Sequence, residues 1–135
     1  MYLVDTNVLS EARRGAPAAL EWMDPVDTRD LFISVVTLGE IAKAAELKAR
    51  SDPRSSAVLV GWLRTTQRRY GGRILPITDE VAIEWGRLEA QRPRGSDGLI
   101  AATALVSRLT LVTRNIADFR DVPIRLINPW DAGPP

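Results

Sequence analysis

Leu31-Phe32-Ile33-Ser34-Val35 has the pattern of a β-strand that is apolar on both faces. Tyr2-Leu3-Val4 lies earlier in the chain and Thr110-Leu111-Val112-Thr113 lies later, and both are short runs of the same kind. Strands that are buried on both faces are typical of parallel sheets with helices packed on each side. The stretch at 31–35 therefore predicts an α/β fold around a parallel sheet.

Helical patterns separate these strands, as expected where strands alternate with helices in a parallel sheet. Pro17 suits the first turn of a helix. Thr37 stands three residues before Glu40, which is the spacing of a capping box, so we expect Thr37 to cap a helix there. Only a short helical turn is expected directly after Asp5. The later helices are expected to begin at Pro53, at Thr78 or Asp79, and at Asp97 after a Ser96 cap.

The same periodicity predicts the remaining strands and the buried faces of the helices. We expect strands at 73–77, 110–113 and 124–127. Two helical segments should each present an apolar stripe to the core. These stripes are Val58, Leu59, Trp62 and Leu63 in one helix, and Val81, Ile83, Trp85 and Leu88 in the other.

The chain has 135 residues, of which 45% are apolar and 26% charged, with a formal net charge of +1. This size fits one domain of about 100–150 residues, which we place at 1–130, followed by a disordered tail at 131–135. No apolar run approaches the ~18–20 residues of a membrane span, and Asp5 comes too early for a signal peptide. We therefore expect a soluble, cytoplasmic protein without membrane contact.

The sequence contains no Cys and no His. The absence of Cys excludes disulfides, thiolate nucleophiles and thiolate zinc sites. The absence of His excludes the Ser-His-Asp triad, histidine acid–base pairs and almost all transition-metal sites. An enzyme of this composition must use carboxylates, hydroxyls, Arg or Lys, and carboxylates most naturally hold a hard cation such as Mg²⁺ or Mn²⁺.

Acidic residues occur where four separate elements are expected to meet one edge of the sheet. Ligands of an open parallel sheet bind at that edge, beyond the carboxyl ends of the strands. Converging carboxylates raise one another's pKa unless a cation lies between them. Three of these acids also have an ordinary structural explanation, namely capping for Glu40, a helix dipole for Asp97 and a turn for Asp118. Asp5 directly follows an apolar strand and should be nearly buried. The four are Asp5, Glu40, Asp97 and Asp118.

Polar and basic side chains near these acids are candidates for contacts with a substrate or a partner. Thr6, Asn7 and Thr113 lie beside the acids and suit either the orientation of water or phosphate or ordinary cap chemistry. Residues 53–78 contain no acid and several arginines. These arginines suit either a solvated helix face or a strip that contacts the phosphates of a nucleic acid or an acidic partner. They are Arg54, Arg64, Arg68, Arg69 and Arg73.

Four stretches of the chain, in order and with matching spacing, resemble the motifs of PIN-domain ribonucleases. They are Leu3-Val4-Asp5-Thr6-Asn7-Val8-Leu9, Ser34-Val35-Val36-Thr37-Leu38-Gly39-Glu40-Ile41, Asp97-Gly98-Leu99-Ile100-Ala101-Ala102-Thr103-Ala104, and Leu111-Val112-Thr113-Arg114-Asn115 with Asp118-Phe119. Two further stretches resemble the FitB-like branch of VapC-type toxins. These are Gly72-Arg73-Ile74-Leu75-Pro76 and Asn128-Pro129-Trp130.

This resemblance implies a three-layer α/β/α sandwich around a parallel sheet of four or five strands. It implies a hydrolase that cleaves RNA with Mg²⁺ or Mn²⁺. By motif, Asp5, Glu40 and Asp97 are the metal-binding acids. Family members place a fourth acid at the position of Asn115 or at that of Asp118, and we favour Asp118 because an amide offers a cation only a neutral carbonyl.

The resemblance also implies partners. A VapC-type toxin of a type II toxin–antitoxin pair is neutralised by a small antitoxin, which binds the DNA of the operon, and such toxins commonly form homodimers. The alternative is an antitoxin-binding regulatory component of a DNA-bound complex with little catalysis. A phosphatase or phosphotransferase with an Asp5 nucleophile is a third option, although that chemistry usually has a second Asp where Asn7 stands. The loop at 92–96 departs from the family, since it is short and polar.

Overall fold

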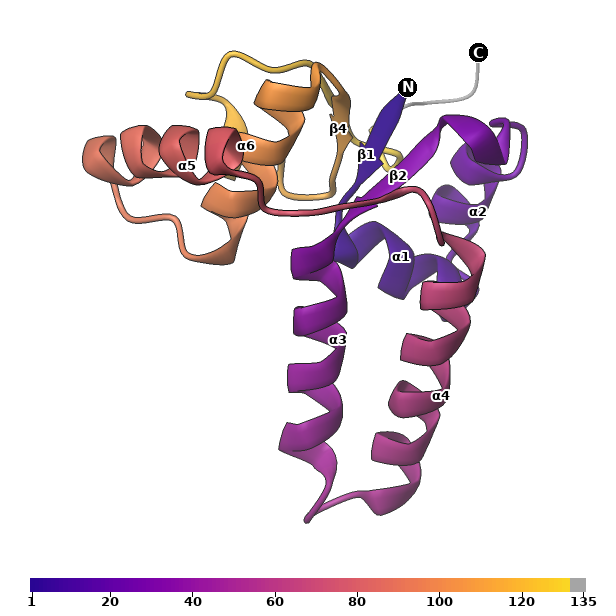
Figure 1. The fold of residues 1–135 in the computed structure, drawn as a ribbon. Helices are drawn as coiled ribbons and strands as arrows, with labels where there is room; N and C mark the ends of the chain where they lie inside the picture. Colours follow the sequence, from indigo (N-terminus) through magenta and orange to yellow (C-terminus); the bar gives the residue numbers. More distant parts are fainter. Residues whose placement is uncertain (132–135) are drawn as a thin grey trace.

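The computed structural model describes residues 1–131, and within them five parallel strands form one sheet in the order β3-β2-β1-β4-β5 (Figure 1). The α/β class with a parallel sheet is thereby confirmed. Of the predicted tail, residues 132–135 lie outside the described part. The strands are β1 (Tyr2–Val4), β2 (Leu31–Ser34), β3 (Ile74–Leu75), β4 (Thr110–Val112) and β5 (Leu126–Ile127).

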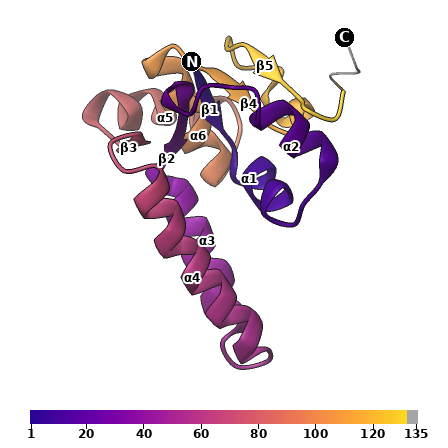
Figure 2. The same ribbon diagram turned by 90° about the vertical axis from the view of Figure 1, so that its right-hand side faces the viewer.

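Six α-helices join the strands of the described chain. The pair α1 and α2 covers one face of the sheet and the pair α5 and α6 covers the other, so the predicted three layers are confirmed (Figures 1 and 2). Short 3₁₀ turns occur at η1 (Thr28–Asp30) and η2 (Ile116–Phe119). The helices are α1 (Thr6–Arg13), α2 (Pro17–Met23), α3 (Val35–Lys48), α4 (Pro53–Arg69), α5 (Asp79–Gln91) and α6 (Ser96–Ser107).

Alternation along the strands assigns neighbouring residues to opposite layers. Leu3 and Leu111 pack with α5 and α6, whereas Val4, Ile33 and Val112 pack with α1 and α2. All five side chains are at most 1% exposed, and each contributes about 1.5–3 kcal/mol by leaving water. The apolar character on both faces of β1, β2 and β4 therefore has a direct structural cause.

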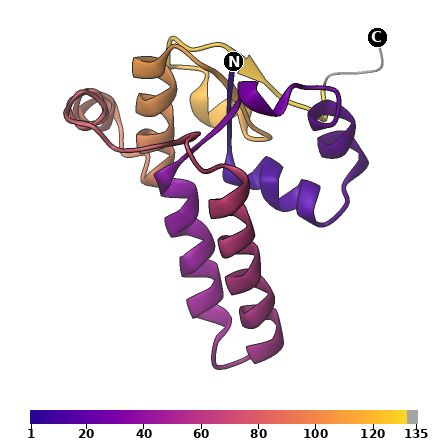
Figure 3. The ribbon, with the colours of Figure 1, turned by 45° about the vertical axis from the view of Figure 1, so that its right-hand side comes forward.

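Helices α3 and α4 form a hairpin that extends away from the sheet (Figures 1 and 3). Because the hairpin packs largely on itself, Val58 of α4 is 57% exposed and does not join the core, against the predicted stripe. The stripe predicted for α5 is wrong at two positions as well. Ile83 and Trp85 are 58% and 37% exposed, because α5 covers the edge of the layer and only Val81 and Leu88 reach the core.

Several predicted boundaries differ from the structure for local reasons. Strand β2 ends at Ser34, since the Ser34 hydroxyl accepts the N–H of Val36 and caps α3. The strands predicted at 73–77, 110–113 and 124–127 are shorter. The expected short turn after Asp5 is the complete helix α1, which Asp5 caps. No helix within residues 1–131 is long and apolar enough to cross a membrane.

Candidate active site

Asp5 lies at the carboxyl end of the central strand β1 and is 4% exposed, which confirms the predicted burial. Its Oδ1 accepts the N–H of Thr6 at 2.8 Å, and its Oδ2 accepts the Thr113 hydroxyl at 2.8 Å. Burial raises the pKa of Asp5 from 3.8 to about 6, the hydrogen bond from Thr113 opposes that rise, and the charges of Asp97 and Glu40 add to it. A buried carboxylate with acidic neighbours is a strong candidate for a cation ligand.

Glu40 lies in the second turn of α3, directly across from Thr6. The predicted capping box is wrong, because Ser34 caps the helix and Thr37 is a buried interior residue. The Thr6 hydroxyl donates to Glu40 Oε1 at 3.0 Å and lies 2.8 Å from the Thr37 hydroxyl. Burial raises the pKa of Glu40, the Thr6 hydrogen bond lowers it, Asp97 raises it and Lys43 lowers it. Capping therefore does not explain Glu40, which leaves the candidate site as its role.

Asp97 is the second residue of α6 and is half-buried. The helix begins at Ser96, with Gly95 at φ +63° as its cap, so the predicted Ser96 cap is wrong. Burial raises the pKa of Asp97, the charge of Asp118 raises it further, and Arg92 opposes the rise. The first turn of a helix favours a carboxylate, yet this does not offset the cost of burial at Asp97.

Asp118 and Asn115 lie after β4 on an exposed rim. The turn η2 follows Thr113, and in it the Asp118 N–H donates to the Asn115 carbonyl at 3.0 Å. Asp118 affects the pKa of Asp97. Asp118 does not appear among the charges that shift the pKa of Asp5, so Asp118 belongs to the Asp97 side of the site.

Asn7 and Thr113 hold Asp5 in place. The Asn7 amide donates to Asp5 Oδ2 at 3.3 Å and its Oδ1 accepts the N–H of Arg114 at 3.2 Å. The Thr113 hydroxyl also accepts the N–H of Asn115 at 3.1 Å. Asn7 thus orients the Asp5 carboxylate and does not provide a second carboxylate. A phosphatase or phosphotransferase with an Asp5 nucleophile therefore has no support from this site.

The donor set of this site consists of oxygen atoms. Three different elements provide Asp5, Glu40 and Asp97. The negative charge of Asp97 raises the pKa of both Asp5 and Glu40. Within residues 1–131 no three acidic side chains lie close enough to form a ready-made metal cluster. Mg²⁺ keeps several waters and uses one or two carboxylates, so separated, mutually repelling carboxylates fit such an ion. Sequence reasoning missed Thr37 here, because its spacing from Glu40 indicated a cap.

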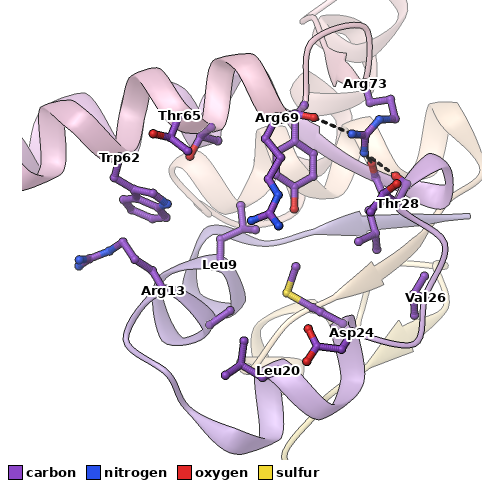
Figure 4. Close-up of a pocket in the computed structure, with 15 residues that line it drawn as sticks. Leu9, Arg13, Leu20, Asp24, Val26, Thr28, Trp62, Thr65, Arg69 and Arg73 are labelled. Atoms are coloured by element: carbon purple, nitrogen blue, oxygen red, sulfur yellow. Dashed lines mark hydrogen bonds between the residues drawn. The ribbon is translucent and has the colours of Figure 1, made fainter.

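Two of the predicted arginines line an apolar cleft of about 380 Å³ on the other side of α1 (Figure 4). Arg69 borders it together with Trp62, whereas Arg73 is engaged by the fold. The Arg73 guanidinium donates to the carbonyls of Leu31 at 2.6 Å and of Arg69 at 2.7 Å. Arg64 and Arg68 are exposed on α4 and do not line this cleft.

A second cleft of about 440 Å³ opens between α1 and the α3–α4 hairpin and has Thr6 and Glu40 in its lining. Its walls carry four basic side chains, three of which sequence reasoning did not single out. Only their convergence in the fold distinguishes them from other surface cations. They are Arg13, Arg14, Lys48 and Arg54.

Comparison with known proteins places these features in a family. The PIN domain family matches residues 2–124. Toxin FitB of Neisseria gonorrhoeae is 30% identical over 139 residues, covering 96% of this chain and 99% of that protein. Ribonuclease VapC10 of Mycobacterium tuberculosis is 34% identical over 134 residues, covering 88% of this chain and 86% of that protein.

Solved structures agree with this assignment. FitAcB of Neisseria gonorrhoeae superposes with a TM-score of 0.85 at 30% identity, covering 97% of this chain and 99% of that one. A toxin–antitoxin complex from Klebsiella pneumoniae superposes with a TM-score of 0.71 at 26% identity, covering 96% of this chain and 98% of that one. The chain belongs to the PIN-domain family and, within it, to the VapC-type toxins of the FitB-like branch.

Proposed function

We propose that this chain is an endoribonuclease that depends on Mg²⁺ or Mn²⁺ and acts in the cytoplasm as the toxin of a type II toxin–antitoxin pair, with residues 1–130 as its single nuclease domain. One observation carries the proposal: the fold brings Asp5, Glu40 and Asp97 to one sheet edge, where burial raises the pKa of each and the charge of Asp97 adds to the rise at the other two. Relatives named VapC ribonucleases support RNA cleavage.

The metal ligands in this proposal are Asp5, Glu40 and Asp97, with Asp118 as the fourth and Asn115 beside it. A Mg²⁺ or Mn²⁺ held there would supply positive charge and Lewis acidity for the attack of water on phosphorus. The chain's own groups hold the carboxylates ionised and oriented, through the hydrogen bonds that Asp5 accepts from Thr113 and Glu40 accepts from Thr6. Such a water attack leaves a 5′-phosphate and a 3′-hydroxyl on the RNA.

The basic cleft between α1 and the hairpin is the proposed path of the RNA. Arg14, Lys48 and Arg54 are exposed there, and the cleft leads to Glu40. Phosphate contacts of this kind supply most of the affinity in nucleic-acid binding that ignores sequence. Arg64 and Arg68 lie farther along α4 and would extend the contact to a longer strand.

The apolar cleft beside α2 is the proposed surface for the antitoxin (Figure 4). Leu9, Leu20 and Trp62 offer it apolar area, while Arg13 and Arg69 offer positive charge to an acidic segment. Arg13 and Trp62 border both clefts, and the Arg13 guanidinium lies 4.9 Å from the centre of the Trp62 ring. An antitoxin bound here would lie next to the path of the RNA.

A regulatory role on DNA is the second candidate, because solved relatives include FitAB bound to an IR36 DNA fragment, at 28% identity and a TM-score of 0.83. In this candidate function the antitoxin contacts the DNA and this chain adds little catalysis.

We also propose a homodimer, for which Ile83 and Trp85 of α5 leave apolar surface exposed. Light scattering of the purified chain tests that assembly.

Cleavage of a fluorogenic RNA tests the main proposal. The chain should be inactive in EDTA and active after addition of Mg²⁺ or Mn²⁺, with 5′-phosphate ends on the products. Glu40→Gln should lose most activity, while Glu46→Gln, an exposed control on the same helix, should keep it. Full activity in EDTA or cyclic phosphate ends would refute the proposal. Growth arrest that the co-expressed neighbouring small gene relieves tests the toxin role.

A further inference from the structure

Arg92 and Arg94, in the short polar loop between α5 and α6, converge on the single carboxylate of Asp121. Arg94 reaches Asp121 through Nη1 at 2.9 Å and Nη2 at 2.8 Å. Arg92 reaches it through Nε at 3.0 Å and Nη2 at 3.1 Å. Each arginine therefore makes a two-pronged charged contact, which fixes both distance and direction, and together they hold the pKa of Asp121 well below its usual range.

The loop side of this contact is rigidly attached to α5. The Arg94 side chain is only 2% exposed. Its Nε donates to the Leu88 carbonyl at 3.3 Å and its N–H donates to Glu89 Oε1 at 2.9 Å. A Cβ at Gly98 would stand 2.8 Å from that Glu89 oxygen, so α6 begins in close contact with the same assembly. Asp97 lies between Arg94 and Gly98 in the sequence, in the first turn of α6 directly after this loop.

The other side of the contact belongs to the turn that carries Asp118. Arg92 Nη2 donates to the Asp118 carbonyl at 2.6 Å. The neighbouring Phe119 is 1% exposed and anchors the turn in the core. Asp121 lies two residues after Phe119, so one network joins the loop that precedes Asp97 to the turn of Asp118, although Asp97 and Asp118 are more than twenty residues apart.

We propose that Asp121, held by Arg92 and Arg94, is a positioning residue that sets the separation of the Asp97 and Asp118 carboxylates and thereby the affinity of the site for a divalent cation. The inference rests on the proposed metal site and adds residues that belong to none of the four matching motifs. The polar loop, which departs from the usual family pattern, provides the two arginines for this purpose.

For a variant that removes the charge of Arg92, a purely electrostatic role and a positioning role predict opposite changes in Mn²⁺ affinity. Arg92 lowers the pKa of Asp97 by its positive charge, and a cation next to a metal site repels a divalent ion. Removing this charge should therefore tighten Mn²⁺ binding if Arg92 acts only as a charge. If Arg92 positions the two carboxylates, its removal should weaken Mn²⁺ binding. The sign of the change separates the two roles.

The test is the Kd for Mn²⁺, measured by calorimetry and electron paramagnetic resonance on the full chain without RNA at pH 7.5. Arg92→Gln should raise that Kd by about tenfold, the size typical of lost partners that orient a metal ligand. Arg94→Lys keeps the charge but loses the fork and should act in the same direction. The matched control is Arg29→Gln, which breaks an equivalent pair with Asp27 at 2.8 Å near the amino end of β2 and should leave the Kd unchanged.

A Kd that falls or stays within twofold of the native value in Arg92→Gln would overturn the positioning role. That variant should fold, since the Arg92 side chain is 43% exposed, and thermal unfolding in EDTA checks it. An Arg94→Lys variant with native affinity would count against the role as well. If the native chain itself binds no Mn²⁺, the metal site fails and this inference fails with it, whereas native binding with unchanged variants removes only the positioning role.

Discussion

The Thr113 hydroxyl donates to Oδ2 of Asp5 across 2.8 Å and joins residues that are 108 positions apart. Both residues follow neighbouring strands, since Val4 pairs with Val112 in the parallel register of β1 and β4. Thr113 is fully buried, so water does not compete for this bond. The bond stabilises the ionised form of Asp5 against the desolvation that raises its pKa.

Thr113→Val removes this bond while nearly preserving shape, and we expect the pKa of Asp5 to rise further. A hydrogen bond to a charged group contributes about 1.5–3 kcal/mol, which corresponds to a pKa rise of about one unit or more. Because binding of a divalent cation requires ionised Asp5, the pH at half-maximal Mn²⁺ binding should move up by about one unit. Thr113→Ser should restore the native profile, and an unchanged profile in Thr113→Val would refute the role of the hydroxyl.

Asp5→Asn should abolish RNA cleavage and raise the stability of the chain without metal. The pKa of Asp5 is raised from 3.8 to about 6 in the fold, so between those pH values the folded chain binds more protons than the unfolded chain. Stability therefore falls as pH rises through this window, by about 3 kcal/mol at most. The cost is fully present above pH 6 and absent below pH 3.8.

Thermal unfolding of both chains in EDTA checks this prediction. The variant should melt several degrees higher at pH 7.5, and the difference should disappear near pH 3.5, which makes low pH the internal control. A strongly lowered melting temperature at pH 7.5 would show that Asp5 is structural. Added Mg²⁺ should stabilise the native chain more than the variant, since only the native chain keeps the carboxylate.

Asp118→Asn should weaken Mg²⁺ binding and lower activity substantially, though less than Asp5→Asn. Asp118 lies at the rim of the site, where its charge raises the pKa of Asp97 but does not contribute to the raised pKa of Asp5. Asn115→Asp should keep or strengthen metal binding, because it adds a carboxylate beside the same turn. Metal titrations of both variants decide the assignment. Native behaviour of Asp118→Asn together with an inactive Asn115→Ala would transfer the fourth position to Asn115.

Replacing Lys48 and Arg54 together by Ala should raise the KM for RNA by about tenfold and leave kcat at saturating RNA unchanged. Both line the basic cleft that leads to Glu40. Each lost phosphate contact should reduce the slope of log affinity against log salt by about 0.7–1. The matched control is Arg125→Ala, since Arg125 lies beside a separate cleft bordered by Met1 and Arg108. Equal KM values for the double variant and the control would remove this path for the RNA.

Much of the fold follows from local pattern. Apolar residues on both faces of β1, β2 and β4 indicate a covered parallel sheet, because neighbouring residues must meet opposite helical layers. Asp5 after an apolar strand indicates a buried charge. The absence of Cys and His leaves carboxylates and other oxygen atoms as the natural ligands of a metal ion. These properties depend on residue type and short spacing, so the sequence alone determines them.

The tertiary structure decided what depends on contacts between distant segments. Spacing suggested that Thr37 caps a helix, whereas its place opposite Thr6 makes it part of the contact with Glu40. Nothing local marks Asp121, which acquires its role only where two arginines of another loop reach it. The exposure of Val58 follows from a hairpin that leaves the sheet. Helical periodicity reports which residues share a face, but only long-range packing decides what that face meets.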